Sequence, residues 1–174
     1  MTRATAALGS VAFFLLAPCV VAGVVPWWLT RWEMREPLAY WTPLRALGIA
    51  LLVTGAVVLV HSFTRFVVEG VGTPAPAAPT EHLVVGGLYR FVRNPMYIAV
   101  VATIVGQGLL LWQPMLLLYA LCLWVLFASF VHWYEEPRLT RQFGDEYDAY
   151  RRAVPAWLPR LRPWRPHAGD PSRR

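Results

Sequence analysis

Two short polar segments of the chain carry residue types that bind charged small molecules. The first segment is Arg93–Tyr97, which reads Arg-Asn-Pro-Met-Tyr. Asparagine is favoured just before a helix and proline fits its first position, so a helix is predicted to begin at Pro95. The free backbone N–H groups and the positive dipole end of its first turn suit a carboxylate or another anion.

The second segment is the acidic pair Glu135 and Glu136. The pair is predicted to end a helix, where the helix dipole disfavours anions, so it needs a partner. An arginine such as Arg93 or Arg138 is one candidate partner. The amine, the sulfonium or the ribose hydroxyls of a bound ligand are the others. Solvation would explain either glutamate alone, but the joint pattern favours a binding site.

A membrane hairpin is the element that would bring these segments together. The 41 residues from Asn94 to Tyr134 contain no charge, which is about twice the roughly 20 apolar residues of one bilayer span. The stretch must therefore turn back on itself, giving spans at about 95–111 and 115–134. We place the break between Gly106 and Pro114, with Gln107 marking the turn. Both polar segments then meet at the open end of the hairpin.

Two earlier charge-free stretches predict two more spans. Ala4–Thr30 gives a span at about 6–25 that ends at Pro26, and Ala46–Thr64 gives one at about 47–68. The predicted fold class is therefore an all-α integral membrane bundle of about four transmembrane helices, forming a single domain.

The cytoplasmic tail, residues 135–174, differs in composition from the spans. Apolar and aromatic residues recur at steps of four, four and three, the pattern of one helical face. These residues are Leu139, Phe143, Tyr147 and Tyr150. We therefore expect one amphipathic C-terminal helix, which prolines from Pro155 onward would end.

The arginine distribution predicts the orientation in the membrane. With four spans both termini share one side, and that side holds thirteen of the sixteen arginines. The opposite side holds only Arg31, Arg35 and Arg45. The positive-inside rule places the termini and the binding site in the cytoplasm, at the plasma or inner membrane if the source is bacterial.

The overall composition excludes other classes of protein. The chain is 57% hydrophobic and 15% charged, whereas soluble domains are about 45–50% apolar and about 25% charged. Its basic residues flank apolar spans without interleaved aromatics, so a nucleic acid is not an expected partner. No spacing of histidine, cysteine or acidic residues suggests a metal site.

The ordered motifs resemble those of the isoprenylcysteine carboxyl methyltransferase family, which is similar to the membrane phospholipid N-methyltransferases. The resemblance covers roughly Leu83 to Pro159 and includes Gly-Leu-Tyr, Arg93–Tyr97, Glu135-Glu136 and Phe143-Gly144. It implies S-adenosylmethionine as cofactor and a lipid-like or small hydrophobic acceptor, methylated on oxygen, nitrogen or sulfur at the cytoplasmic membrane face.

The resemblance also implies residues that bind the cofactor. By position in the motifs they are His82, Leu83, Val84, Tyr89, Asn94, Pro95, Tyr97 and Glu135. The chain departs from the family at Asn94, where a histidine is usual. It also has Val131 where the prenylcysteine enzymes carry an arginine assigned to the substrate.

Three residues are candidate catalytic groups. Arg93 directly precedes the predicted helix start, while His132 and Glu136 are the nearby groups that could deprotonate an amine or thiol acceptor. Two other functions stay open at this point. One is a nicotinamide-dependent membrane reductase of similar helical fold, and the other is a non-enzymatic scaffold or partner subunit.

Overall fold

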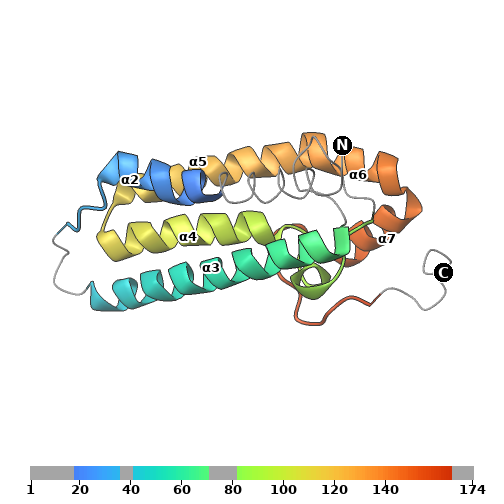
Figure 1. Ribbon diagram of the computed structural model, residues 1–174, viewed down its shortest axis with the longest axis horizontal. Helices are drawn as coiled ribbons and strands as arrows, with labels where there is room; N and C mark the ends of the chain where they lie inside the picture. The colour runs from blue at the N-terminus through green and yellow to red at the C-terminus, as the bar shows by residue number, and fades with distance from the viewer. Residues whose placement is uncertain (1–17, 36–40, 71–81, 166–174) are drawn as a thin grey trace.

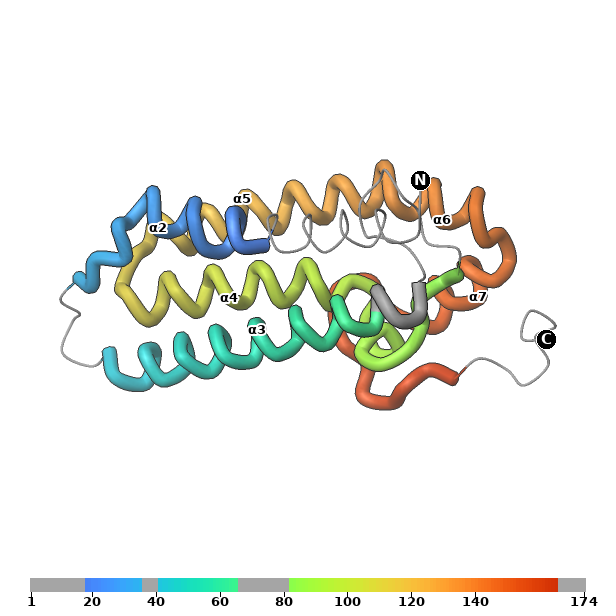
Figure 2. The backbone as a smooth tube through the Cα atoms, viewed as in Figure 1, coloured from blue at the N-terminus to red at the C-terminus, as the bar shows by residue number. Residues whose placement is uncertain are grey.

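The computed structural model describes residues 18–35, 41–70 and 82–165, the side chains of 66–70 excepted. Every regular element within these ranges is helical, which confirms the all-α prediction for this part of the chain. Within these ranges, four apolar helices lie side by side along the long axis, and two polar helices lie at one end (Figures 1 and 2). The four are α2 (Val25–Thr30), α3 (Thr42–Gly70), α4 (Pro95–Leu111) and α5 (Pro114–Phe130).

Helix α4 lies between α3 and α5 and packs closely against α3 (Figure 1). A Cβ atom on Gly48 would lie 2.8 Å from the Gly106 carbonyl oxygen, and one on Gly55 would lie 2.9 Å from the Ala99 carbonyl oxygen. No side chain larger than hydrogen fits at these positions. Small residues of this kind let helix backbones approach closely where hydrophobic expulsion from water does not drive association.

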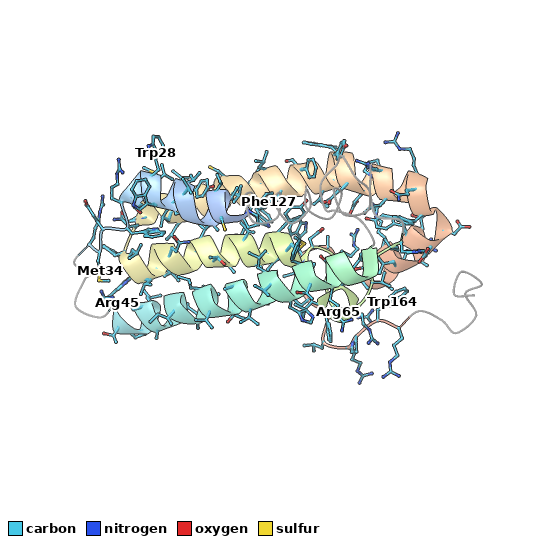
Figure 3. The ribbon with its side chains drawn as sticks, viewed as in Figure 1. Trp28, Met34, Arg45, Arg65, Phe127 and Trp164 are labelled. Carbon is cyan, nitrogen blue, oxygen red and sulfur yellow. The ribbon has the colours of Figure 1, made fainter. Side chains whose placement is uncertain are left out.

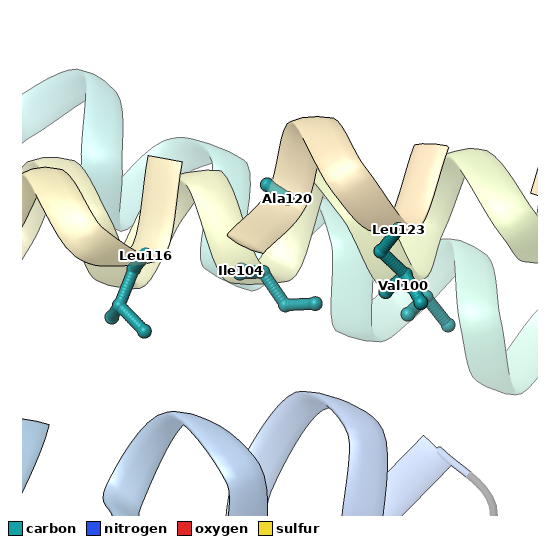
Figure 4. Packing of buried hydrophobic residues seen from close by; sticks show 5 residues of the cluster. All are labelled: Val100, Ile104, Leu116, Ala120 and Leu123. Atoms are coloured by element: carbon teal, nitrogen blue, oxygen red, sulfur yellow. The ribbon is translucent and has the colours of Figure 1, made fainter. Parts of the chain in front are cut away.

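The hydrophobic core joins α4 to α5. Val100 and Ile104 of α4 interlock with Leu116, Ala120 and Leu123 of α5 (Figure 4). Side chains from the segment before α2 and from α3 complete this cluster. The antiparallel pairing of α4 with α5 is the predicted hairpin. Helix α4 begins at Pro95 and ends at Leu111, in agreement with the predicted span at 95–111.

The apolar helices leave most of their surface outside the core. The helical segments Thr42–Arg65 and Pro114–Phe143 are long and apolar enough to cross a membrane. Only 17% and 22% of their most apolar stretches are buried, whereas a core helix of a soluble protein is mostly buried. The helical segments Val20–Thr30 and Pro95–Leu111 are apolar but shorter. The count of four spans therefore stays a prediction.

The end predicted for the first span is wrong. The helix continues through Pro26 and ends at Thr30, while residues 6–17 of that span lie outside the described residues. A π-helical turn, η1 (Val20–Val24), precedes Pro26, and the Val25 N–H donates to the Val20 carbonyl. Proline has no N–H to donate and sits in the first turn of α2, where helices tolerate it. The left-handed conformation of Arg31 ends the helix.

The start predicted for the second span is also wrong. Helix α3 begins at Thr42 rather than near residue 47, so Arg45 belongs to its first turn and not to the preceding loop. The Arg45 N–H donates to the Trp41 carbonyl at 3.0 Å. Thr42-Pro43 is typical of a helix start. The Arg45 side chain contacts Met34, and both lie at the end of the molecule opposite Arg65 and Trp164 (Figure 3).

The hairpin reverses at the end of the predicted break at 106–114, and not at Gln107. Gln107 is a helical residue of α4, and the chain reverses at Trp112, which has a left-handed conformation, and at Gln113. The buried Gln107 side chain donates to the Ala22 carbonyl at 2.7 Å and accepts from the Trp32 indole N–H at 3.2 Å. It therefore fastens α4 to neighbouring segments and does not mark the turn.

The predicted end of the last span and the single tail helix need correction. The α5 helix does not stop at Tyr134. It continues through a π-helical turn, η3 (Val131–Glu135), into α6 (Glu136–Phe143), so the acidic pair does not face an exposed helix C-terminus. Gly144, at φ +51°, then separates α6 from α7 (Asp145–Ala153). The predicted amphipathic helix is thus two helices with a sharp turn between them.

Candidate active site

The open end of the hairpin brings the start of α4 beside the end of the α5 helix. Pro95 begins α4 as predicted, but the Asn94 side chain does not cap it. The Asn94 amide instead donates to the Ala156 carbonyl at 3.2 Å. The first turn of α4 is therefore not closed by a capping side chain, and its N–H groups can serve an anionic ligand.

Tyr97 and Glu135 form a direct contact across this opening. Tyr97 lies in the first turn of α4, and its side chain is hydrogen-bonded to the Glu135 carboxylate at the end of η3. The Tyr97 ring also packs on Phe127, with ring centroids 4.6 Å apart, and Tyr89 lies near Tyr97. Three residues that the family resemblance assigned to the cofactor therefore meet here.

A second cluster of side chains forms around Glu136, the residue that follows Glu135 in the chain. Glu136 accepts from the Arg93 guanidinium at 2.7 Å, and Arg151 lies 3.3 Å away. The Arg93 and Glu136 side chains are only 11% and 9% exposed. Arg93 also donates to the Tyr147 hydroxyl at 3.0 Å. The predicted pairing of an arginine with the acidic pair is confirmed for Arg93 and Glu136.

The C-terminal segment, residues 154–165, packs against the residues that directly precede α4. Six hydrogen bonds tie residues 90–94 to residues 154–164, among them the bond from the Asn94 amide to Ala156 and one from the Arg90 side chain to Trp164. Backbone bonds run from the Arg93, Arg160 and Trp164 N–H groups to the Pro155, Phe91 and Arg90 carbonyls, and the Arg93 Nε donates to Val154. Nothing in the sequence predicted this pairing, because a segment interrupted by prolines has no periodic pattern.

Tyr150 of α7 holds the turn that precedes α4. Its hydroxyl donates to the Tyr89 carbonyl at 2.6 Å, and Tyr89 belongs to the short 3₁₀ helix η2 (Gly87–Arg90). Burial raises the pKa of Tyr150 above its usual range, so the hydroxyl keeps the proton that it donates. Burial also raises the pKa of Tyr147, while the nearby Arg93 opposes this shift.

The remaining predicted site residues lie around this centre. Leu83 packs against the cluster of Tyr147, Tyr150 and Val154, while Val84 is buried and His82 is exposed. Pro95 is buried at the helix start.

His132, predicted as a base, is 68% exposed and lies 4.0 Å from Glu136. Val131 is buried at the start of η3.

Trp157 is a neighbour of the site that the sequence did not reveal. It comes from the C-terminal segment, and its ring centroid lies 6.5 Å from that of Tyr97 and 6.3 Å from that of Trp124 on α5. Tyr97, Phe127, Trp124 and Trp157 thus form an aromatic wall beside Glu135. A carboxylate beside aromatic faces is a setting that suits a cationic ligand group.

Comparisons with known proteins identify relatives of this chain. The phospholipid methyltransferase family model matches residues 44–146, more than half of the chain. The protein-S-isoprenylcysteine O-methyltransferase of Schizosaccharomyces pombe is 37% identical over 81 residues, covering 45% of this chain and 34% of that protein. The protein-S-isoprenylcysteine O-methyltransferase B of Arabidopsis thaliana is 27% identical over 136 residues, covering 76% of this chain and 60% of that protein.

A third relative carries a different activity in its name. The phosphatidylethanolamine N-methyltransferase of Phaeosphaeria nodorum is 28% identical over 99 residues, covering 53% of this chain and 10% of that protein. No solved structure matches the chain. The chain spans less than two thirds of the length of each of these three relatives.

The family match decides between the interpretations that the sequence left open. It favours a methyltransferase over a nicotinamide-dependent reductase or a scaffold, and it confirms the family to which the motifs pointed. The match extends beyond the motif region and includes most of α3, all of α4 and α5, and the start of α7. The chain belongs to the phospholipid methyltransferase family.

Proposed function

We propose that this chain is an S-adenosylmethionine-dependent methyltransferase that acts on a lipid-like or small hydrophobic acceptor at the cytoplasmic face of a membrane. The observation that carries the proposal is the contact between Tyr97 and Glu135. It joins a helix start that offers N–H groups to a carboxylate on the neighbouring helix, within the motifs of a methyltransferase family.

The residues present suit the chemical groups of this cofactor. The uncapped first turn of α4 offers donors for the cofactor carboxylate. The Glu135 carboxylate can accept from ribose hydroxyls or pair with the amine, and the aromatic wall offers faces to the sulfonium. When bound, the cofactor supplies a methyl group already activated by its positive sulfur.

The protein then has to align the acceptor and exclude water rather than provide a covalent nucleophile. We assign Arg93 and Glu136 to positioning, because the ion pair between them leaves Glu136 little capacity as a base. His132 is the group that would take a proton from an amine or thiol acceptor, and its exposure would let that proton reach water.

We further propose four membrane spans, with both termini and the site in the cytoplasm. The spans are the N-terminal segment that ends with α2, followed by α3, α4 and the α5 helix. The exposed apolar surface of α3 and α5 and the arginine distribution support this topology. A lipid-like acceptor would then reach the site sideways from the bilayer, while the polar cofactor enters from the cytosol.

Binding of the demethylated cofactor, S-adenosylhomocysteine, to the purified full chain in nanodiscs tests the proposal. Glu135→Gln and Tyr97→Phe are expected to weaken binding by roughly tenfold to a hundredfold. The first variant removes the charge of the carboxylate, and the second removes the hydroxyl that is hydrogen-bonded to that carboxylate. Asp145→Asn, an exposed carboxylate on α7, is the matched control and should bind like the wild type.

A folded wild type that binds neither the methylated nor the demethylated cofactor at millimolar concentration would contradict the proposal. Once binding is established, methyl transfer from labelled cofactor to fractions of a lipid extract would identify the acceptor. A methyl ether or ester as product would identify oxygen as the accepting atom, a methylamine would identify nitrogen, and a methyl thioether would identify sulfur.

A further inference from the structure

The C-terminal segment after α7 contains two leucines whose side chains are exposed. Leu158 is 78% exposed and Leu161 is 99% exposed. Exposed leucines of this kind are unfavourable in water, because their apolar surface remains hydrated. Neither leucine belongs to a hydrophobic cluster of the described part of the chain.

The backbone around these leucines is held on both sides. The Arg160 N–H donates to the Phe91 carbonyl at 3.0 Å, and its guanidinium donates to the Ala153 carbonyl at 2.7 Å. The Trp164 N–H donates to the Arg90 carbonyl at 2.9 Å, and the Arg90 side chain donates back to Trp164 at 2.7 Å. The leucines therefore cannot fold inward without breaking these bonds.

The segment also continues the apolar surface of the bundle. Trp157, directly before Leu158, packs against Trp124, which is 42% exposed on α5. Trp124 lies eleven residues before Glu135, about 16 Å along the helix at a rise of about 1.5 Å per residue. The segment thus touches a part of α5 well inside the apolar stretch.

Positive charge surrounds the exposed leucines. Arg162 and Arg165 are exposed beside them, and Arg151 and Arg152 are exposed on the adjacent α7. Leucines inserted among acyl chains, with arginines at the headgroups, are the arrangement of interfacial membrane anchors. Each basic residue near an anionic leaflet adds to such binding.

We propose that residues 156–165 form a membrane anchor, in which Leu158 and Leu161 insert into the cytoplasmic leaflet and Arg162 and Arg165 bind anionic phospholipid headgroups. The anchor would fix Trp157 against Tyr97 and so complete the wall of the site from the lipid side. This inference rests on the membrane insertion proposed above and not on methyl transfer.

Spin labels test the insertion directly. Single cysteines for labelling replace Leu158 or Leu161 in a full chain that carries Cys19→Ala and Cys122→Ala. Leu126 on α5 serves as the lipid-facing control and Asp145 on α7 as the water-facing control, and both positions are exposed. Collisions with oxygen and with a water-soluble nickel chelate are measured in nanodiscs of phosphatidylcholine, with or without phosphatidylglycerol.

The labels at 158 and 161 are expected to favour oxygen over the chelate, as the label at 126 does, and unlike the label at 145. Chelate access at 158 and 161 equal to that at 145 would overturn the insertion. If the label at 126 also meets the chelate freely, membrane insertion of the bundle itself fails, which is a distinct result.

The charge part of the inference has its own test. Arg162→Gln combined with Arg165→Gln should reduce the oxygen preference at 158 and 161 in discs that contain phosphatidylglycerol and leave it unchanged in phosphatidylcholine alone. An unchanged preference in both kinds of disc would overturn the role of anionic headgroups. Binding of S-adenosylhomocysteine, measured in parallel, reports separately on the cofactor site.

Discussion

The two ends of the α4–α5 hairpin hold their polar groups in different ways. At the closed end, neutral amides bond to backbone carbonyls. Gln107 donates to Ala22 and Gln113 donates to Glu33, each at 2.7 Å. At the open end, carboxylates accept hydrogen bonds from side chains, Glu136 from Arg93 and Glu135 from Tyr97. The closed end uses its polar groups to fasten segments together, and the open end gathers charge around a helix start.

The open end also separates its two acidic residues by role. Glu136 pairs with Arg93 and has Arg151 and His132 close by, so its charge is balanced within the protein. Glu135 is bonded to a neutral tyrosine and lies beside aromatic faces. We therefore expect changes at Glu136 to act on stability and changes at Glu135 to act on cofactor binding.

The largest effect is expected for Glu136→Ala. The variant leaves the buried Arg93 guanidinium without its anion, which typically costs about 3–5 kcal/mol of unfolding free energy. Thermal unfolding in detergent measures the loss, and Asp145→Ala on the exposed start of α7 is the control. Combining Glu136→Ala with Arg93→Met should cost less than the sum of the two single changes. Strict additivity would show that the pair is not coupled.

The next effect in size is expected at the close approach of α3 to α4 near the closed end. Gly48→Ala places a methyl group 2.8 Å from the backbone of Gly106 and Leu110, so overpacking should cost about 1–3 kcal/mol. Gly23→Ala is the matched control, because nothing lies within 4 Å of its added methyl group. Equal melting temperatures for both variants would mean that the helices separate without cost.

An effect of similar size is expected for Gln107→Met, which keeps the side-chain length but removes two hydrogen bonds. The unpaired Ala22 carbonyl and Trp32 indole should lower the unfolding free energy by about 1–3 kcal/mol. Because Gln107 lies at the closed end, away from the proposed cofactor site, S-adenosylhomocysteine binding should stay unchanged in this variant. A matching loss of binding would show that the closed end also shapes the site.

The smallest effect concerns alkaline pH and Tyr150→Phe. The variant loses one hydrogen bond, worth about 1 kcal/mol at neutral pH. Burial raises the folded pKa of Tyr150, so above the ordinary tyrosine pKa of about 10 the unfolded chain ionises first. The wild type should therefore lose stability more steeply than Tyr150→Phe as the pH rises past that value. Parallel pH curves for the two proteins would contradict this.

Local signals in the sequence were enough to predict much of the hairpin. Asn94-Pro95 predicts the start of α4, which begins at Pro95, and the long uncharged stretch requires a reversal before Pro114. Other boundaries failed because tertiary contacts override local signals. Pro26 is accommodated after a π-helical turn, and Glu135 and Glu136 lie within a continuing helix because Arg93 neutralises the second of them.

The sequence by itself determined the helical class, the apolar stretches, the family and the two polar segments, because these depend on composition and on motifs of neighbouring residues. Only the tertiary structure decided which glutamate is paired with Arg93, why Asn94 does not cap α4, and that Trp157 lies beside Tyr97. Each of these contacts joins residues more than 40 positions apart. Periodicity and spacing report only on near neighbours, so such contacts follow from the packing of the helices.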